Sequence, residues 1–256
     1  MVLVALAKVT FLESLRNRTM YILLLFGLVF VVLAKTLGYI SSGDPEKMIL
    51  MAGLNGMTLF GFIIALFSGM SLIQKELSQR TVYTILSKPV DRYQFILGKY
   101  IGLMALYALI VALMGLIFVI FFKWEGGELT IEILYYLILL LAELSLVTTI
   151  AIFFSLLASP IFSAIATFCL FVAGNAMETV FDRVLYLDSG NWLARYLIIG
   201  VHMVTPNFYN FNITNEIVNR YSVPILRVGA VALYGLLFSA FFLIISIINF
   251  SRKRLQ

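Results

Sequence analysis

The chain has 256 residues, of which 62% are hydrophobic and only 12% are charged, and its mean hydropathy is +1.04. This composition excludes an ordinary soluble domain and indicates an integral membrane protein. The net charge of +5 does not point to nucleic acid, because the basic residues lie beside apolar runs, where they set orientation in the lipid bilayer.

Six apolar runs are long enough to cross a membrane, which takes about 20 residues for about 30 Å of hydrocarbon. They cover approximately residues 20–40, 53–73, 98–122, 131–158, 161–180 and 226–250. Their continuity favours helices over barrel strands, which are about ten residues long and alternate in polarity. The first run is longer than the apolar core of a secretory signal, so we expect it to remain as a span. The sequence predicts an all-α integral membrane protein with six transmembrane helices in one domain, 1–256.

The positions of basic residues predict the orientation of this bundle. Most of them lie before the first run, between the second and third, or after the last: Lys8, Arg16, Arg18, Lys75, Arg80, Lys88, Arg92, Lys99, Arg252, Lys253 and Arg254. The loops on the opposite side carry the acids Asp44, Glu46, Glu125 and Glu128. Both termini, and by parity the turn at 158–160, are therefore expected on the cytoplasmic side.

The longest connection, 181–227, is expected on the outer side and holds an apolar cluster between Trp192 and Ile199 beside Arg195. This pattern predicts an outer interfacial helix before the last span, which Pro206 would end.

The segment 75–95 is a charged island between two apolar runs. Val82, Ile85 and Leu86 give the stretch 80–86 one apolar stripe, which predicts a short helix that docks on another surface. Pro89 interrupts the helix, and Asp91 with Gln94 forms a variant capping box that would start the third span. The residues alone are equally consistent with a loop that reverses the chain and satisfies the positive-inside bias.

A resemblance bears on this alternative. The residues Lys75-Glu76-Leu77, Arg80-Thr81, Leu86-Ser87-Lys88-Pro89-Val90-Asp91-Arg92 and Phe95-Ile96-Leu97-Gly98-Lys99-Tyr100-Ile101-Gly102 resemble the cytoplasmic signature of the ATP-binding-cassette (ABC) type 2 permeases. The closest variety is the one named for multi-copper enzyme maturation. Residues 11–18 and the six-span count are similar to that family as well, and the segment 1–18 resembles its N-terminal interfacial helix.

The resemblance implies an ABC permease subunit that acts as an exporter in the inner membrane of a prokaryote, is paired with a second copy and is driven by an ABC ATP-binding subunit. A short cytoplasmic coupling helix would rest on that subunit. The residues assigned to this coupling are Glu76, Arg80, Thr81, Val82, Tyr83, Ile85 and Leu86. The chain lacks a phosphate-binding Gly-x-x-x-x-Gly-Lys-Ser/Thr loop, so it is not expected to be an enzyme, and ATP and Mg²⁺ would be bound by the partner.

Polar residues inside the predicted spans form a second group of candidates. Glu143 lies near the middle of the fourth run, and we expect it to face the interior and bond to Ser145, Thr148 or Thr149. It is interpreted either as a substrate or proton site or as a protonated structural donor, the latter being favoured. Asn175 and Glu178, near the outer end of the fifth run, would line an external gate or anchor the interface; we favour the anchor.

Two further patterns bear on packing and on other functions. Gly98 and Gly102 form a Gly-x-x-x-Gly pair that would let another helix approach the third span closely. The single histidine, His202, and the single cysteine, Cys169, provide neither a metal site nor a disulfide within one chain. The sequence lacks the nucleophile, base or paired acids that an intramembrane hydrolase would need. The alternative function is therefore an ATP-independent ion-coupled carrier or channel that uses Glu143.

Overall fold

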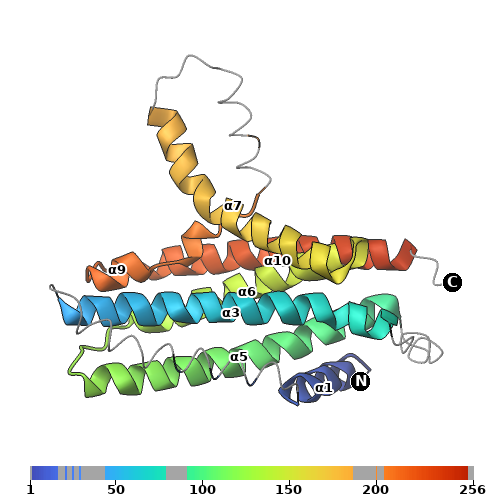
Figure 1. Ribbon diagram of the computed structural model, residues 1–256, viewed down its shortest axis with the longest axis horizontal. Helices are drawn as coiled ribbons and strands as arrows, with labels where there is room; N and C mark the ends of the chain where they lie inside the picture. Colours follow the sequence, from blue (N-terminus) through green and yellow to red (C-terminus); the bar gives the residue numbers. More distant parts are fainter. Residues whose placement is uncertain are drawn as a thin grey trace.

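The computed structural model describes residues 2–16, 21, 25, 29, 44–78, 91–186, 200 and 205–252, and it describes side chains for the same residues except 73–78, 177–186 and 252. All regular secondary structure in these parts is helical (Figure 1). The elements are α1 (Val2–Leu15), α3 (Pro45–Ser78), α5 (Arg92–Trp124), α6 (Glu132–Leu157), α7 (Pro160–Tyr186), the 3-10 turn η1 (Tyr209–Phe211), α9 (Thr214–Val218) and α10 (Ile225–Arg252).

Four of the described helices are long and apolar enough to cross a membrane: Pro45–Leu72, Arg92–Trp124, Glu132–Leu157 and Ile225–Ser251. They correspond to the second, third, fourth and sixth predicted spans. The fifth predicted span falls within α7, whose described apolar stretch, Pro160–Ala176, is shorter. The first predicted span lies almost entirely outside the described residues, as do the predicted interfacial helix at 192–199 and the predicted coupling helix at 80–86.

The helices extend beyond the apolar runs from which they were predicted. Helix α3 begins at Pro45, whose fixed φ suits the first turn of a helix, and Glu46 in that turn complements the helix dipole. Helix α5 begins directly after Asp91, which occupies the predicted cap position. The predicted capping hydrogen bond is absent, because the Asp91 side chain makes no cap bond and the Gln94 amide donates to the Tyr93 hydroxyl at 3.2 Å.

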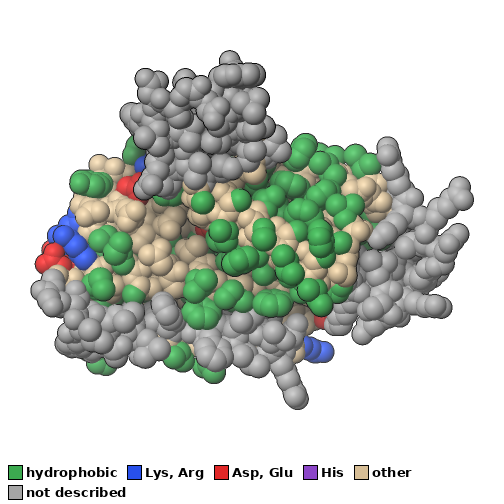
Figure 2. Space-filling view, turned by 45° about the horizontal axis from the view of Figure 1, so that its top comes forward, with side chains coloured by type: hydrophobic (Ala, Val, Ile, Leu, Met, Phe, Trp, Pro, Cys, Tyr) green, Lys and Arg blue, Asp and Glu red, His purple; other side chains and the backbone are tan. Residues whose placement is uncertain are grey.

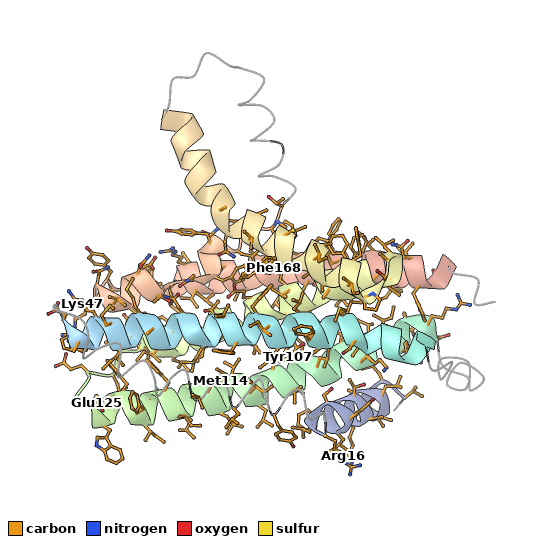
Figure 3. The ribbon with its side chains drawn as sticks, in the orientation of Figure 1. Arg16, Lys47, Tyr107, Met114, Glu125 and Phe168 are labelled. Atoms are coloured by element: carbon orange, nitrogen blue, oxygen red, sulfur yellow. The ribbon has the colours of Figure 1, made fainter. Side chains whose placement is uncertain are left out.

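Helix α6 lies at the centre of the bundle, packs along both α3 and α10, and is the most buried of the four long helices. Large side chains fill the space around it, and Figure 3 shows Tyr107 and Met114 of α5 pointing into this interior. Helix α10 is the least buried of the four. Lys47 and Glu125 mark one end of the bundle, and Arg16 lies near the other (Figure 3).

Two connections shape the bundle. Ser159 alone separates the end cap of α6 from α7, and the Ser163 hydroxyl donates back to the Ala151 carbonyl at 3.1 Å. The second connection, 205–213, is irregular backbone whose phenylalanines are buried against the helices. The Phe211 ring lies over Gly235, about 15 Å into α10 at 1.5 Å per residue. Irregular backbone at such depth is tolerated because it is covered by α6, α7 and α10.

Hydrophobic side chains cover much of the described face in Figure 2, and most of the charged side chains visible on it gather toward its edges. Exposed apolar residues continue along α10, including Leu226, Leu233, Leu236, Leu237, Phe241 and Ile244. A surface of this composition, with charges confined to the ends, is what a bilayer requires of a spanning bundle.

Candidate functional site

The predicted coupling residues are the least described part of the chain. Arg80, Thr81, Val82, Tyr83, Ile85 and Leu86 lie outside the described residues. Glu76 belongs to the last turns of α3, but its side chain is not described. The flanking helices nevertheless fix where this loop must begin and end. Ser78 and Arg92 lie at the same end of the bundle as α1 and the C-terminal end of α10 (Figure 1).

A set of buried hydroxyl groups joins the long helices to one another. The Tyr100 hydroxyl of α5 is 2.5 Å from the Ser145 hydroxyl of α6, which is 3.0 Å from the Ser239 hydroxyl of α10. Nearer the start of α3 and α6, the Tyr136 hydroxyl of α6 donates to the Leu54 carbonyl of α3 at 2.5 Å. Hydrogen bonds of this kind hold membrane helices together where apolar packing alone gives little preference.

Glu143 is buried inside the bundle, with 3% of its surface exposed, at about 16 Å from the start of α6. It makes no hydrogen bond or ion pair with any residue that the structure describes. The expected bonds to Ser145, Thr148 and Thr149 are wrong, because these hydroxyls are used elsewhere. Ser145 joins Tyr100 and Ser239, and the two threonines donate to the Leu144 and Leu146 carbonyls of their own helix at 2.7 and 2.8 Å.

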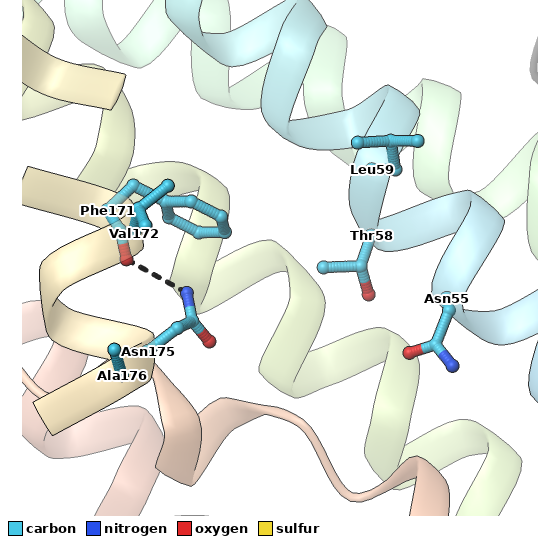
Figure 4. Close-up of a pocket in the computed structure, with 7 residues that line it drawn as sticks. All are labelled: Asn55, Thr58, Leu59, Phe171, Val172, Asn175 and Ala176. Carbon is cyan, nitrogen blue, oxygen red and sulfur yellow. Dashed lines mark hydrogen bonds between the residues drawn. The ribbon is translucent and has the colours of Figure 1, made fainter. Parts of the chain in front are cut away.

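Asn175 lines a groove of about 470 Å³ between α3 and α7. Figure 4 shows the two walls, and the lining consists of Asn55, Thr58 and Leu59 of α3 and Phe171, Val172, Asn175 and Ala176 of α7. The Asn175 amide donates to the Phe171 carbonyl at 3.0 Å, and the Asn55 amide oxygen accepts from Asn212 at 3.3 Å. Each asparagine thus keeps one amide atom without a hydrogen bond to a described residue. Such a lining suits an uncharged, mainly apolar group with one or two polar atoms.

The α3 wall of this groove was not among the residues predicted from the sequence. Asn55 and Thr58 are polar residues three apart in an apolar run, which places them on one helical face, and this spacing was the available signal. The sequence did not indicate which helix would lie opposite them. Glu178 is one turn beyond Asn175 on α7, and its side chain is not described.

Gly98 and Gly102 lie against α1. A Cβ atom on Gly98 would be 2.7 Å from the Leu6 Cβ, and one on Gly102 would be 2.5 Å from the Ala7 carbonyl oxygen and 2.8 Å from the Thr10 Cβ. Moving four residues along α5, from Gly98 to Gly102, thus moves the contact four residues along α1, from Leu6 to Thr10. The two helices therefore lie side by side and run in the same direction.

The opposite end of the bundle carries a cluster of ion pairs that the sequence did not predict. Arg220, in the left-handed conformation with φ of 57°, donates to Glu128 at 2.9 Å and to Glu46 at 3.2 Å. Arg227 donates to Glu216 at 2.9 Å. The cluster joins the start of α3, the loop between α5 and α6, and the turn after α9. The two acids that pair with Arg220, Glu46 and Glu128, were predicted to lie in loops on the same side of the membrane.

No group of three or more potential metal ligands occurs among the residues whose positions the structure gives. His202 lies outside the described residues, and Cys169 is exposed on α7.

Comparison with known proteins bears on this arrangement. A search of curated proteins found no match. A family model described as "ABC-2 family transporter protein" matches residues 11–181, well over half of the chain, from the end of α1 into α7 and across the predicted coupling segment. The long apolar helices are compatible with this match, and because the family model covers well over half of the chain, the chain belongs to the ABC-2 family of transporter proteins.

Proposed function

We propose that this chain is the membrane-spanning permease subunit of an ABC exporter, driven by a separate ATP-binding subunit through the loop between α3 and α5. The observation that supports this proposal most directly is the family match over residues 11–181. The described arrangement is compatible with it, because the ends of α3 and α5 that flank the loop share one end of the bundle with α1 and the end of α10.

The proposed assembly contains two copies of the permease with six spans each, and the ATP-binding partner supplies ATP and Mg²⁺ binding. The chain contributes no phosphate-binding loop of its own. Both termini would lie in the cytoplasm, at the inner membrane of a prokaryote. The resemblance to the multi-copper enzyme maturation variety rests on short sequence segments and adds no substrate to the proposal.

The groove between α3 and α7 is the proposed place of contact with substrate. It lies between two membrane helices, its described lining carries no charge, and the Asn55 and Asn175 amides each keep one atom without a hydrogen bond to a described residue. A movement of α7 against α3 would change its width, which is the kind of change that alternates access across a membrane.

The proposal is tested by purifying the tagged protein from its native host in nanodiscs and measuring ATPase activity and co-eluting subunits. We expect a stoichiometric ATP-binding subunit, which the double variant Tyr83→Asp, Ile85→Asp should lose or leave uncoupled, because two carboxylates would be buried in an apolar contact. The matched control is Tyr221→Asp, Ile225→Asp, which alters exposed residues of the same types at the opposite end. Equal loss in both variants, or a protein that purifies alone, would contradict the proposal.

The second candidate function is an ATP-independent ion-coupled carrier or channel. The observation that favours it is Glu143, a carboxyl group buried in mid-span without a partner among the described residues. This function predicts ion movement in liposomes that contain the chain alone, whereas the permease predicts none without the ATP-binding subunit.

A further inference from the structure

The first three turns of α5 contact three other helices. Gly98 and Gly102 lie against α1, the Lys99 ammonium is 3.5 Å from the Leu72 carbonyl oxygen of α3, and Arg92 reaches the end of α10. Lys99 is also buried, with its ammonium 5.2 Å from the centre of the Phe95 ring. This short stretch of α5 is therefore a junction of α1, α3 and α10 at one end of the bundle.

The contact between α5 and the end of α10 is specific. The Arg92 guanidinium donates to the Ser251 carbonyl at 2.6 Å and to the Phe250 carbonyl at 3.3 Å. These carbonyls belong to the last turn of α10 that the structure describes, and near the C-terminal end of a helix the carbonyls accept hydrogen bonds from a cation that the helix dipole also favours. Beneath this contact the fully buried rings of Phe95 and Phe250 stack with centroids 5.9 Å apart.

Arg92 is also the first residue of α5, two residues after the segment 79–90. A displacement of that segment acts on α5 at its first turn. Arg92 and Phe95 lie in this first turn and contact Phe250 and Ser251. The end of α10 is therefore bound to the part of α5 that the segment would move first. Farther along α10, the Ser239 hydroxyl bonds to the Ser145 hydroxyl of α6, which also bonds to the Tyr100 hydroxyl of α5.

We propose that Arg92 is a positioning residue that makes the last membrane helix follow the movement of the loop between α3 and α5. The inference rests on the proposed function, because the proposed function assigns that loop to contact with an ATP-binding subunit. It adds a route by which the contact reaches a helix that lies 158 residues away in the sequence.

The test uses the complex with its ATP-binding subunit in nanodiscs. Spin labels are placed at Tyr93→Cys and Ser251→Cys, both exposed, in a Cys169→Ser background that removes the exposed native thiol. The dipolar broadening between the labels is compared in the nucleotide-free and the ATP–vanadate-trapped states. It is measured with Arg92 present, in Arg92→Ala, in Arg92→Lys, and in Arg227→Ala, an arginine control at the opposite end.

With Arg92 present, the broadening should be the same in both states. In Arg92→Ala, at least half of it should be lost on vanadate trapping, whereas Arg92→Lys, which keeps a cationic donor, and Arg227→Ala should retain it. A contact that only supports the fold would instead loosen equally in both states, and that result would overturn the inference. So would an Arg92→Ala complex whose broadening is unchanged by trapping. A wild-type chain that purifies without any ATP-binding subunit would overturn the proposed function and this inference together.

Discussion

Glu143 shows how far a single residue could be interpreted from the sequence. A carboxyl group near the middle of an apolar run was expected to face the interior, and it is buried there. Its expected partners were wrong, because hydroxyls close in the sequence bond to their own helix carbonyls or to other helices. Sequence distance along α6 did not reveal that Ser145 faces α5 and α10.

Replacing Glu143 distinguishes a structural from a functional carboxyl. We predict that Glu143→Leu raises the free energy of unfolding by about 1–3 kcal/mol, because it removes a buried polar group that has no hydrogen-bond partner among the described residues. Glu143→Gln, which keeps the size and polarity, should change it by less and leave the ATPase activity of the complex intact. Thermal unfolding in detergent and ATPase assays measure both effects. Loss of ATPase activity in both variants, with the complex still assembled, would instead establish Glu143 as a functional site.

At the scale of helices, hydropathy predicted most of the architecture. Runs of about 20 apolar residues correspond to α3, α5, α6 and α10, because the need to cross a bilayer acts on every residue of a span. The ends were less predictable, since helices continue into polar residues such as those after Pro45. The return of 205–213 to the interior was not predicted, because Phe208 and Phe211 find their places against Gly174 and Gly235 only in three dimensions.

The pairing of α1 with α5 is a case in which half of an interaction was predictable. The Gly98 and Gly102 spacing indicated a close helix approach, but α1 has no clear apolar stripe that would have identified it as the partner. Two helices approach closely where glycine and small side chains, such as Ala7 and Thr10, let their backbones come near each other. Hydropathy does not distinguish such small residues, so it could not identify α1 as the partner.

This pairing predicts that the two glycines are intolerant of a methyl group. Gly102→Ala would place a Cβ against the α1 backbone, which cannot give way as a flexible side chain does, and should destabilise the packing of α1 by about 1–3 kcal/mol. Gly229→Ala in α10 is the matched control, because nothing lies within 4 Å of its Cβ position, and it should be neutral or stabilising by up to about 1 kcal/mol. Protease protection of α1 and thermal unfolding measure the difference, and equal behaviour of the two variants would disprove the close approach.

At the scale of the whole molecule, the two ends of the bundle differ in charge. One end carries the basic residues Lys8, Arg16 and Arg92 with only two acids, Glu13 and Asp91, on α1 and at the start of α5. The other carries Lys47, Lys123, Arg220 and Arg227 among the acids Asp44, Glu46, Glu125, Glu128, Glu132 and Glu216. The ion pairs of Arg220 are exposed, so each contributes only about 0–1 kcal/mol, but they neutralise basic charge at this end.

This asymmetry predicts which end faces the cytoplasm. Under the positive-inside rule, the end with α1 and Ser251 lies inside and the end with Glu128 lies outside. In a Cys169→Ser background, a membrane-impermeant maleimide should therefore label Glu128→Cys in intact cells, and Ser251→Cys only in inside-out vesicles, since both side chains are exposed. Because Ser78 and Arg92 share the end with Ser251, the same result would place the loop between them where an ATP-binding subunit can reach it. Labelling in the reverse pattern would put that loop outside the cell and make an ATP-driven mechanism through it impossible.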